Sequence, residues 1–384
     1  MKKVYEEVHK KFLALEAELR SRFFEREEVV RGLLVALVAR GNVLVLGPPG
    51  TAKTDLAQTI CGQVGGKFFA RLLTKVSAPE ELFGPLSLKA LENDEYRRVT
   101  AGKLPEAHVA VIDEVFKCNS AVLNTLLPIM NERVFFDDSG QGRPIPLMLL
   151  VGLSNELPEG GTDGELAALW DRFDLRFIVD YLRDERNFSA MLGLNGSRPQ
   201  TAITLAEVQQ AQQEAAQVNV PEPVVQAMVR LWKELRQNGF VVSDRRFRNS
   251  LRFLKANAWL EGRREVAEDD FEILPHVMWQ EPKQIRTVRK IVLGFANPLV
   301  VKANEIYDGA VELYQKLKDL PANSEEQARA ATEANAKLKQ AAKKLQSLAE
   351  QAVLEGKSPA AIKARIGQIQ EINKDIIDKY LLGI

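Results

Sequence analysis

The chain has 384 residues, and its 52 lysines and arginines balance its 52 aspartates and glutamates, so the formal net charge is zero. With 46% hydrophobic and 27% charged residues, the composition excludes wholesale disorder and fits a globular protein of roughly two or three domains. The balanced charge argues against a protein that mainly coats nucleic acid. Two cysteines, Cys61 and Cys118, and three histidines exclude a disulfide framework and a tetrahedral Cys/His metal site.

The N-terminal segment does not have the pattern of a targeting signal. Its opening, MKKVYEEVHKKF, is too charged for the apolar core of a signal peptide. The most apolar stretch, Val29 to Leu46, is interrupted by Arg31 and Arg40 and ends in a glycine turn, which argues against a membrane span. We therefore expect a cytoplasmic protein.

In the first half of the chain, apolar runs alternate with helical patterns. The runs have the length and continuous hydrophobicity of buried parallel strands and cover Val43–Leu46, Lys67–Leu72, His108–Ile112, Leu147–Leu153 and Leu175–Val179. The helical patterns cover Thr54–Val64, a segment starting at a capping box of Ser77 and Glu80, and Ala121–Glu132, where Pro128 predicts a kink or an early restart. This alternation predicts a doubly wound α/β domain that binds its ligand at the carboxyl ends of the strands.

Two insertions interrupt the alternation. The segment Leu82–Ala107 contains Gly84-Pro85 and Ala101-Gly102, which favour a hairpin over a continued helix. The segment Val134–Pro146 has a turn cluster, DDSGQGRP, between two apolar runs and also predicts a hairpin.

The second half, from about Tyr181, carries helical patterns and no strand signal. Val224–Gln237 and Phe247–Leu260 are amphipathic, and three more helical stretches follow Asn297, the second capped by Ser324 and the third beginning at Ser358-Pro359. Their apolar residues recur at alternating steps of three and four, as at Ile362, Ile366, Ile369, Ile372 and Ile376. We expect a three-helix bundle packed on itself, with a partner-binding coiled coil as the alternative.

The strongest chemical signal is an octapeptide between a predicted strand and a predicted helix. It consists of Gly47, Pro48, Pro49, Gly50, Thr51, Ala52, Lys53 and Thr54. A loop of this type directs backbone N–H groups at phosphates, while the lysine meets the β- and γ-phosphates and the threonine hydroxyl binds Mg²⁺. Ala52 stands where the second glycine of the motif belongs, which the loop tolerates if φ there is negative. A glycine-proline turn without a ligand is the alternative.

Polar side chains follow two further strands. Asp113 and Glu114 end the run VAVIDE, where Asp113 can hold Mg²⁺ through water and Glu114 can polarise the attacking water as a general base. Asn155 follows the strand Leu147–Leu153 and would lie between the other strand ends, where its amide could orient the water or sense the γ-phosphate. A helix cap and a turn asparagine, respectively, are the alternatives. Lys117 is interpreted as a solvated surface lysine, and Phe24-Glu25-Arg26 is too loosely marked to be assigned to an adenine pocket.

Five strings in order, GPPGTAKT, VIDEVFK, LNTLLPIMNER, LSNELPE and ALWDRFDLRF, resemble the MoxR family of AAA+ ATPases, and among them the RavA-like branch. The resemblance covers about residues 15–285. In the RavA-like branch an alanine also precedes the lysine of the phosphate loop, as Ala52 does here. Those proteins interrupt a helical region with a small β-rich domain, whereas residues 285–384 carry uninterrupted helical patterns, so a partner bound through such a domain is not implied.

The resemblance implies a fold and a set of site residues. The fold is an AAA+ P-loop core with a five-stranded parallel sheet between helices in residues 1–182, an all-α lid in 183–285 and a C-terminal helical region in 286–384. Asn155 is similar to the sensor 1 residue, Arg172 to an arginine finger that reaches a neighbour's γ-phosphate, and Arg245 to the sensor 2 arginine, which would contact the nucleotide. The two insertions resemble the helix-2 and pre-sensor-1 hairpins.

The family implies Mg²⁺-dependent ATP hydrolysis by a homo-hexameric ring that remodels a client protein, together with a partner that contains a von Willebrand factor A domain. Other interpretations stay open. Arg172 could pair locally with Asp171 or Asp174, and Arg246 or Arg248 could take the place of Arg245. A nucleic-acid motor could use Arg97, Arg98 and Lys103, although the neutral charge makes nucleic acid an unfavoured partner. The third alternative is a nucleotide-gated scaffold with incidental hydrolysis.

Overall fold

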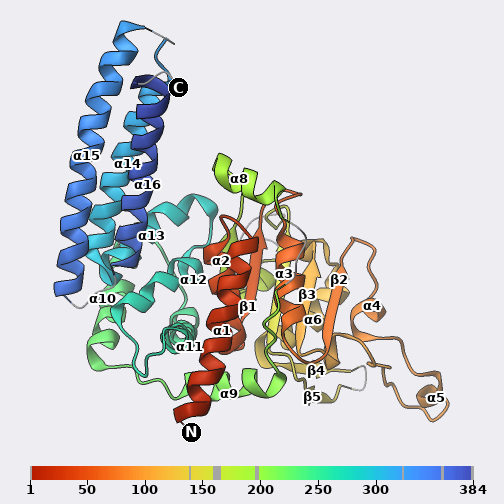
Figure 1. The fold of residues 1–384 in the computed structure, drawn as a ribbon. Coiled ribbons are helices and arrows are strands. Elements are labelled where there is room, and N and C mark those ends of the chain that lie inside the picture. The colour runs from red at the N-terminus through yellow and green to blue at the C-terminus, as the bar shows by residue number, and fades with distance from the viewer. Residues whose placement is uncertain are drawn as a thin grey trace. The chain divides into compact units, whose positions relative to one another are not determined.

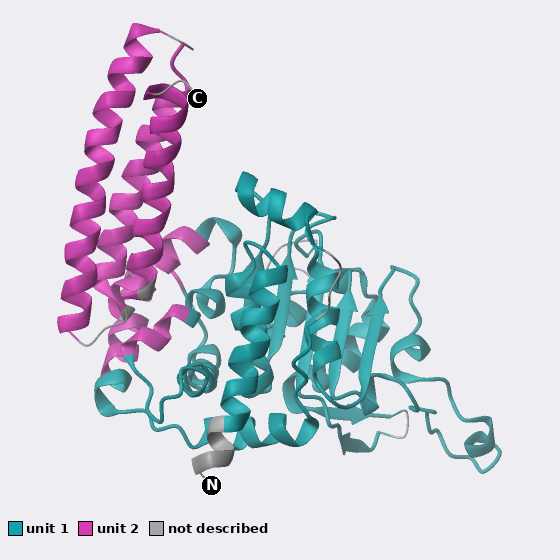
Figure 2. Ribbon diagram, in the orientation of Figure 1, with its two compact units in different colours: residues 1–225, 241–267, 273–284 teal, residues 226–240, 268–272, 285–384 magenta. Residues whose placement is uncertain are grey.

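The computed structural model describes residues 2–137, 140–158, 166–194, 199–321, 324–355 and 359–381. Two compact units are distinguished within the chain (Figure 2). The first comprises residues 1–225, 241–267 and 273–284, and the second comprises residues 226–240, 268–272 and 285–384. No helix in these described ranges combines the length and the apolar character that crossing a membrane requires.

The first unit is built around a five-stranded parallel sheet with the order β2-β3-β6-β1-β7 (Figure 1). Its strands are β1 Asn42–Leu46, β2 Phe68–Leu72, β3 Val109–Asp113, β6 Leu149–Ser154 and β7 Leu175–Ile178. Every residue of β1 and β6 is buried, as expected for central strands of a parallel sheet that is covered on both faces. The predicted fold class is confirmed.

The register of the sheet brings three strand ends together. Leu46 of β1 lies opposite Ser154 of β6, and Ile112 of β3 lies opposite Gly152 of β6. Because all strands run in one direction, the residues that follow β1, β3 and β6 meet at one edge of the sheet. We call this the carboxyl edge.

Helices surround the sheet and connect its strands (Figure 1). The helices of the first unit are α1 Lys2–Arg22, α2 Glu27–Ala39, α3 Lys53–Gln63, α4 Pro79–Phe83, α5 Leu88–Leu91, α6 Ser120–Glu132, α7 Ala167–Arg172, α8 Glu185–Leu192, α9 Leu205–Ala216, α11 Asp244–Leu260 and α12 Pro275–Met278. Helix α6 runs through Pro128 without a restart. Proline leaves the carbonyl of Asn124 without its helical partner, and Asn124 is exposed, so water can satisfy that carbonyl.

The capping box predicted at Ser77 and Glu80 is wrong by one residue. Pro79 takes the first helical position of α4, so Ala78 is the N-cap and its N–H donates to Glu81 Oε1 over 3.0 Å. The hydroxyl of Ser77 instead accepts the backbone N–H of Thr74 over 3.0 Å and closes the preceding turn.

Both insertions fold back on themselves. In the first, Ser87 N–H donates to Arg97 O and Val99 N–H donates to Pro85 O, each over 2.8 Å, and α5 occupies the segment between these paired residues. In the second, β4 Val134–Phe136 pairs antiparallel with β5 Gly142–Pro144. Asp138 and Ser139, at the predicted turn, lie outside the described residues.

The second unit contains a three-helix bundle. The helices of this unit are α13 Ile285–Ala296, α14 Pro298–Lys318, α15 Glu325–Leu354 and α16 Ala360–Ile376, together with α10 Glu222–Gln237 from Gln226 onward. The bundle consists of α14, α15 and α16. Leucines, isoleucines and alanines of α14, α15 and α16 form one buried cluster. Ser324 caps α15 by accepting the N–H of Gln327 over 3.0 Å, while Ser358 lies outside the described residues. The bundle packed on itself is confirmed.

Candidate nucleotide-binding site

The loop 47–52 joins β1 to α3 at the carboxyl edge. Glycine is required at two of its positions for different reasons. A Cβ on Gly47 would lie 2.3 Å from the carbonyl oxygen of Val179, and Gly50 has a φ of 81°, where side chains are disfavoured. The Thr51 hydroxyl donates to Pro48 O over 2.8 Å and tightens the turn. A compact glycine turn directly before a helix N-terminus is suited to an anion such as phosphate.

The expectation that Ala52 has a negative φ is wrong. Its φ is 60° and its ψ is 23°, the left-handed conformation. Ala52 is the N-cap of α3, so this backbone turn directs the chain from the loop into the helix. An alanine in this region costs about 1–2 kcal/mol relative to the right-handed form.

Lys53, the first residue of α3, turns its side chain back into the loop. Its ammonium donates to Gly47 O over 2.6 Å, to Pro48 O over 2.8 Å and to Asn155 Oδ1 over 2.8 Å. Burial lowers the pKa of Lys53 below its ordinary value, although the nearby Asp113 and Glu114 oppose the shift. The ammonium therefore lies inside the loop, where a bound phosphate oxygen could replace a carbonyl.

Thr54 and Asp113 lie side by side. The Thr54 hydroxyl donates to Asp113 Oδ2 over 2.9 Å, and Asp113 Oδ1 accepts the backbone N–H of Glu114 over 2.9 Å. Hydroxyl and carboxylate oxygens are the ligand types that Mg²⁺ prefers. Two such oxygens leave most of an octahedral shell for phosphate oxygens and water, so this pair fits the metal.

Glu114 is held by two neighbours. It is only 9% exposed and has a φ of 52°. The Asn155 amide donates to Glu114 Oε1 over 2.5 Å, while Lys117 Nζ lies 3.4 Å from Glu114 Oε2. Asn155 thus links Lys53 to Glu114 through its two amide atoms. The Lys117 side chain is 44% exposed, as expected for a solvated surface lysine, and it also forms an ion pair with Glu114.

Arg172, at the end of α7, has unused hydrogen-bonding capacity. Its Nη1 donates to Ala168 O over 3.1 Å, and its buried Nε finds no hydrogen-bond partner among the described residues. Asp171 is paired with Arg245 and Arg246, and Asp174 is paired with Arg252 over 2.7 Å. In the described ranges, neither aspartate forms an ion pair with Arg172, so the structure does not show the local pairing that the sequence left open.

Two adjacent arginines of α11 have different environments. The guanidinium of Arg246 is buried and donates to the backbone carbonyls of Asp171, Phe173, Asp174 and Val277. Burial lowers the pKa of Arg246. These bonds fix the turn after Arg172 and hold the Arg246 guanidinium against backbone carbonyls.

Arg245 is about half exposed and forms an ion pair with Asp171. Burial raises the pKa of Asp171, but Arg246 and Arg245 outweigh this effect and hold the pKa below its usual value. Within the part of the chain that the structure describes, no hydrogen bond or ion pair joins Arg245 to the phosphate loop. The structure therefore places Arg245 beside the Arg172 segment, and its role as sensor 2 stays a prediction.

Comparison with known proteins assigns the chain to a family. Residues 10–218, more than half of the chain, match the family described as the MoxR domain in the MoxR-vWA-beta-propeller ternary systems. The chain belongs to the MoxR family. Residues 223–292 match an AAA lid domain, so a lid follows the MoxR domain along the chain. The predicted family is confirmed, while the RavA-like branch stays a prediction.

Individual relatives agree with this assignment. An uncharacterized protein of Methanocaldococcus jannaschii is 38% identical over 315 residues, which cover 82% of this chain and 80% of the relative. Chaperone MoxR1 of Mycobacterium tuberculosis is 26% identical over 209 residues, which cover 54% of each chain. A crystal structure of a candidate ATPase from Cytophaga hutchinsonii matches with a TM-score of 0.61 and 18% identity, covering 77% of this chain and 97% of that one. At that identity it shows the fold alone.

The MoxR domain holds one further arginine at the phosphate loop. Arg26, the N-cap of α2, is 7% exposed and donates to Thr51 O over 3.5 Å and to the carbonyl of Asp180. Burial lowers the pKa of Arg26. Its contacts lie 25 and 154 residues away along the chain, so no local pattern marks it. Lys117, by contrast, lies three residues after Glu114 and could have been found from that spacing.

Two cations of the first insertion form hydrogen bonds within that insertion or to the residue directly before it. Arg98 Nη1 donates to Gly84 O over 2.9 Å, and Lys103 Nζ donates to Glu81 O over 3.2 Å. Arg97 is exposed. Two of the three cations considered for nucleic-acid binding are therefore engaged in holding the insertion together.

Proposed function

We propose that this MoxR-family chain hydrolyses ATP in a homo-hexameric ring and uses the cycle to remodel a client protein. The observation that carries the proposal is the hydrogen-bonded series from Lys53 through Asn155 to Glu114. It joins a cation for the phosphates to a carboxylate for the water, across the ends of three adjacent strands. A ligand-free turn before a helix would not need this arrangement.

Each residue has a distinct task in the proposed reaction. Lys53 binds the β- and γ-phosphates, Asn155 orients the attacking water, and Glu114 accepts its proton as general base. Thr54 and Asp113 hold Mg²⁺, which when bound neutralises charge on the phosphate oxygens. The buried position of Glu114 keeps bulk water from competing for its carboxylate.

We further propose that Arg172 acts on the nucleotide of a neighbouring protomer, with Arg245 beside it. Two observations support this proposal: the Nε of Arg172 has no partner among the described residues, and Arg246 anchors the segment that carries Arg172. An arginine supplied from a neighbour is worth about 10³–10⁵ in rate. Such head-to-tail contacts close into rings.

The partner and the domain division are also proposals. The description of the matching family names vWA and beta-propeller components, which supports a partner with a von Willebrand factor A domain. Relatives named chaperone MoxR1 and chaperone protein ClpB support a protein client. We retain the division into a core of residues 1–182, a lid of 183–285 and a C-terminal region of 286–384, of which the matched lid overlaps the second part.

Mixing two inactive variants tests the proposal. Rings of Arg172→Ala and rings of Glu114→Gln should each lose phosphate release, because every site lacks one group. In mixed rings an Arg172→Ala protomer keeps Glu114 and receives Arg172 from a Glu114→Gln neighbour, so about a quarter of the sites should recover at random mixing.

The control is Arg329→Ala, an exposed arginine of α15, which should retain full turnover alone. Native mass spectrometry should establish that the variants form mixed rings of six. Mixed rings without any recovered turnover would show that Arg172 does not act across protomers. Active rings made only of Glu114→Gln would show that Glu114 is not the general base.

A further inference from the structure

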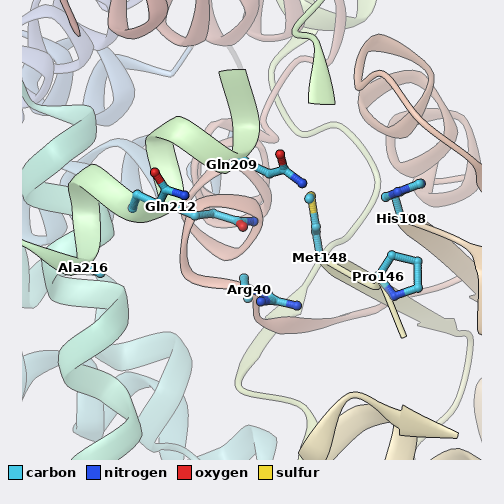
Figure 3. A pocket seen from close by; sticks show the side chains of 8 residues that line it. Arg40, His108, Pro146, Met148, Gln209, Gln212 and Ala216 are labelled. Atoms are coloured by element: carbon cyan, nitrogen blue, oxygen red, sulfur yellow. The ribbon is translucent and has the colours of Figure 1, made fainter. Parts of the chain in front are cut away.

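A cavity of about 560 Å³, open to solvent, lies at the edge of the sheet where β3 and β6 begin, which is opposite the carboxyl edge. Figure 3 shows side chains that line it. Its wall includes His108 and Met148, which directly precede β3 and β6, and Arg40, which follows α2. Helix α9 supplies another wall. The volume falls within the range of about 300–1,000 Å³ that small-molecule sites occupy. No task in the proposed ATPase cycle uses these residues.

His108 offers a hydrogen-bond donor to this cavity. The backbone N–H of Lys67 donates to His108 Nδ1 over 2.9 Å, so Nδ1 carries no proton. The neutral ring must then carry its proton on Nε2. Burial and the charge of Lys67 lower the pKa of His108, which favours this neutral form.

Of the described residues that line the cavity, Arg40 alone carries a charge, and its side chain is exposed. Its backbone is anchored, because its carbonyl accepts Arg133 Nη2 over 2.9 Å and Arg252 Nη1 over 3.4 Å. Its guanidinium forms no hydrogen bond or ion pair with any residue in the described ranges. Among the described residues, no aspartate or glutamate lines the cavity to neutralise this charge.

The remaining lining combines amides with apolar surface. The Gln212 amide donates to Leu37 O over 2.9 Å. The amides of Gln209 and Gln213 have no hydrogen bond to the described part of the chain. Pro146 and Met148 supply an apolar face (Figure 3). The cavity therefore presents one positive charge, several neutral donors and an apolar patch.

We infer that this cavity binds a small organic carboxylate with an apolar body. The carboxylate pairs with Arg40, for which a planar guanidinium is the suitable partner, and the body covers Pro146 and Met148. One uncompensated cation matches a singly charged acid better than a phosphate dianion. This inference is independent of the proposed ATP hydrolysis.

Methyl NMR of the full chain, with ¹³C-methyl methionine, tests the inference with benzoate as the probe. The Met148 resonance, assigned by Met148→Leu, should shift saturably with a Kd of about 1 mM or tighter. Benzamide, which is the neutral counterpart, and phenyl phosphate should each bind about tenfold more weakly or worse. Equal binding of benzoate and benzamide would overturn the inference, as would stronger binding of phenyl phosphate or the absence of any shift.

Two variants locate the site. Arg40→Gln should weaken benzoate binding about tenfold or more, because it removes the cation but leaves the anchored backbone. Gln213→Glu should do the same by placing a negative charge at the rim, whereas Gln217→Glu, an exposed residue outside the lining, should leave the Kd unchanged. Unchanged binding in Arg40→Gln would contradict the assignment.

Discussion

The carboxyl edge of the sheet and the C-terminal bundle differ in backbone strain and in the groups that they bury. At the carboxyl edge, Ala52 and Glu114 adopt left-handed backbone and Lys53 and Glu114 bury charge. In the bundle, buried residues such as Ile362, Ile369 and Ile376 recur at helical spacing. Strain and buried charge oppose folding, so they persist where the surrounding structure compensates for them. The bundle therefore contributes stability through packing, whereas the carboxyl edge keeps strained and charged groups at the proposed nucleotide site.

The largest expected effect is on catalysis at the carboxyl edge. Glu114→Gln should lower phosphate release about 10²–10⁴-fold, because the amide cannot accept a proton from water. Nucleotide affinity and the unfolding free energy should change little, since glutamine can still accept the Asn155 hydrogen bond. Steady-state phosphate release, titration with a fluorescent ATP analogue and urea unfolding measure the three quantities.

Glu156→Gln is the matched control for this variant. Glu156 is also an acid beside Asn155, but its side chain is exposed. Its replacement should leave turnover within about twofold of the parent. If both variants lost turnover equally, the role of Glu114 would be that of local charge rather than of a base.

In the bundle, a substitution should change stability and leave turnover unaffected. Ile369→Ala should lower the unfolding free energy of the bundle by about 2–5 kcal/mol, because it opens a cavity in a fully buried position. Turnover under native conditions should stay near the parent value. Urea unfolding followed by far-UV circular dichroism measures the loss.

Val353→Ala provides the comparison within the same bundle. Val353 is 60% exposed on α15, so its truncation should cost less than about 0.5 kcal/mol. Equal losses in the two variants would mean that the buried cluster does not stabilise the bundle.

Sequence patterns predicted the bundle and the strand positions because both depend on local spacing. The apolar steps of three and four gave α14, α15 and α16, and continuous apolar runs gave the five strands. The strand-end residues Asp113, Glu114 and Asn155 could also be placed together, since parallel strands end at one edge.

Other features depend on contacts that are distant along the chain. Arg26 contacts the carbonyl of Asp180, and Arg246 contacts that of Asp171, so neither interaction has a sequence signature. The φ of Ala52 escaped prediction for another reason, because the loop as a whole imposes it on a residue whose own preference is negative φ.

The strain at Ala52 predicts a stabilising substitution at the carboxyl edge. Ala52→Gly should raise the unfolding free energy by about 0.5–1 kcal/mol, because glycine adopts positive φ without cost. Ala57→Gly, at a buried position inside α3, should lower it by about 1 kcal/mol or more. Urea unfolding measures both. The same sign for both variants would show that the backbone at Ala52 is not strained.

The smallest expected effect concerns Lys117, which restrains the proposed base. Its ammonium is 3.4 Å from Glu114 Oε2 and its side chain is 44% exposed, so the pair is worth only about 0–1 kcal/mol. Lys117→Ala should therefore raise basal turnover by about two- to fivefold, as Glu114 becomes free to turn toward water. Lys339→Ala, an exposed lysine of α15, should have no effect, and Lys117→Arg should keep the restraint.

The salt dependence of turnover shows whether Lys117 restrains Glu114 or whether its loss only impairs the site. Salt partly screens an ion pair whose lysine is 44% exposed, so the turnover of the parent should rise with salt toward that of Lys117→Ala, while the variant responds less. A lower turnover in Lys117→Ala at every salt concentration would instead mean that Lys117 holds Glu114 in its working position. In that case the ion pair would belong to the catalytic arrangement, and the carboxyl edge would have no separate restraint.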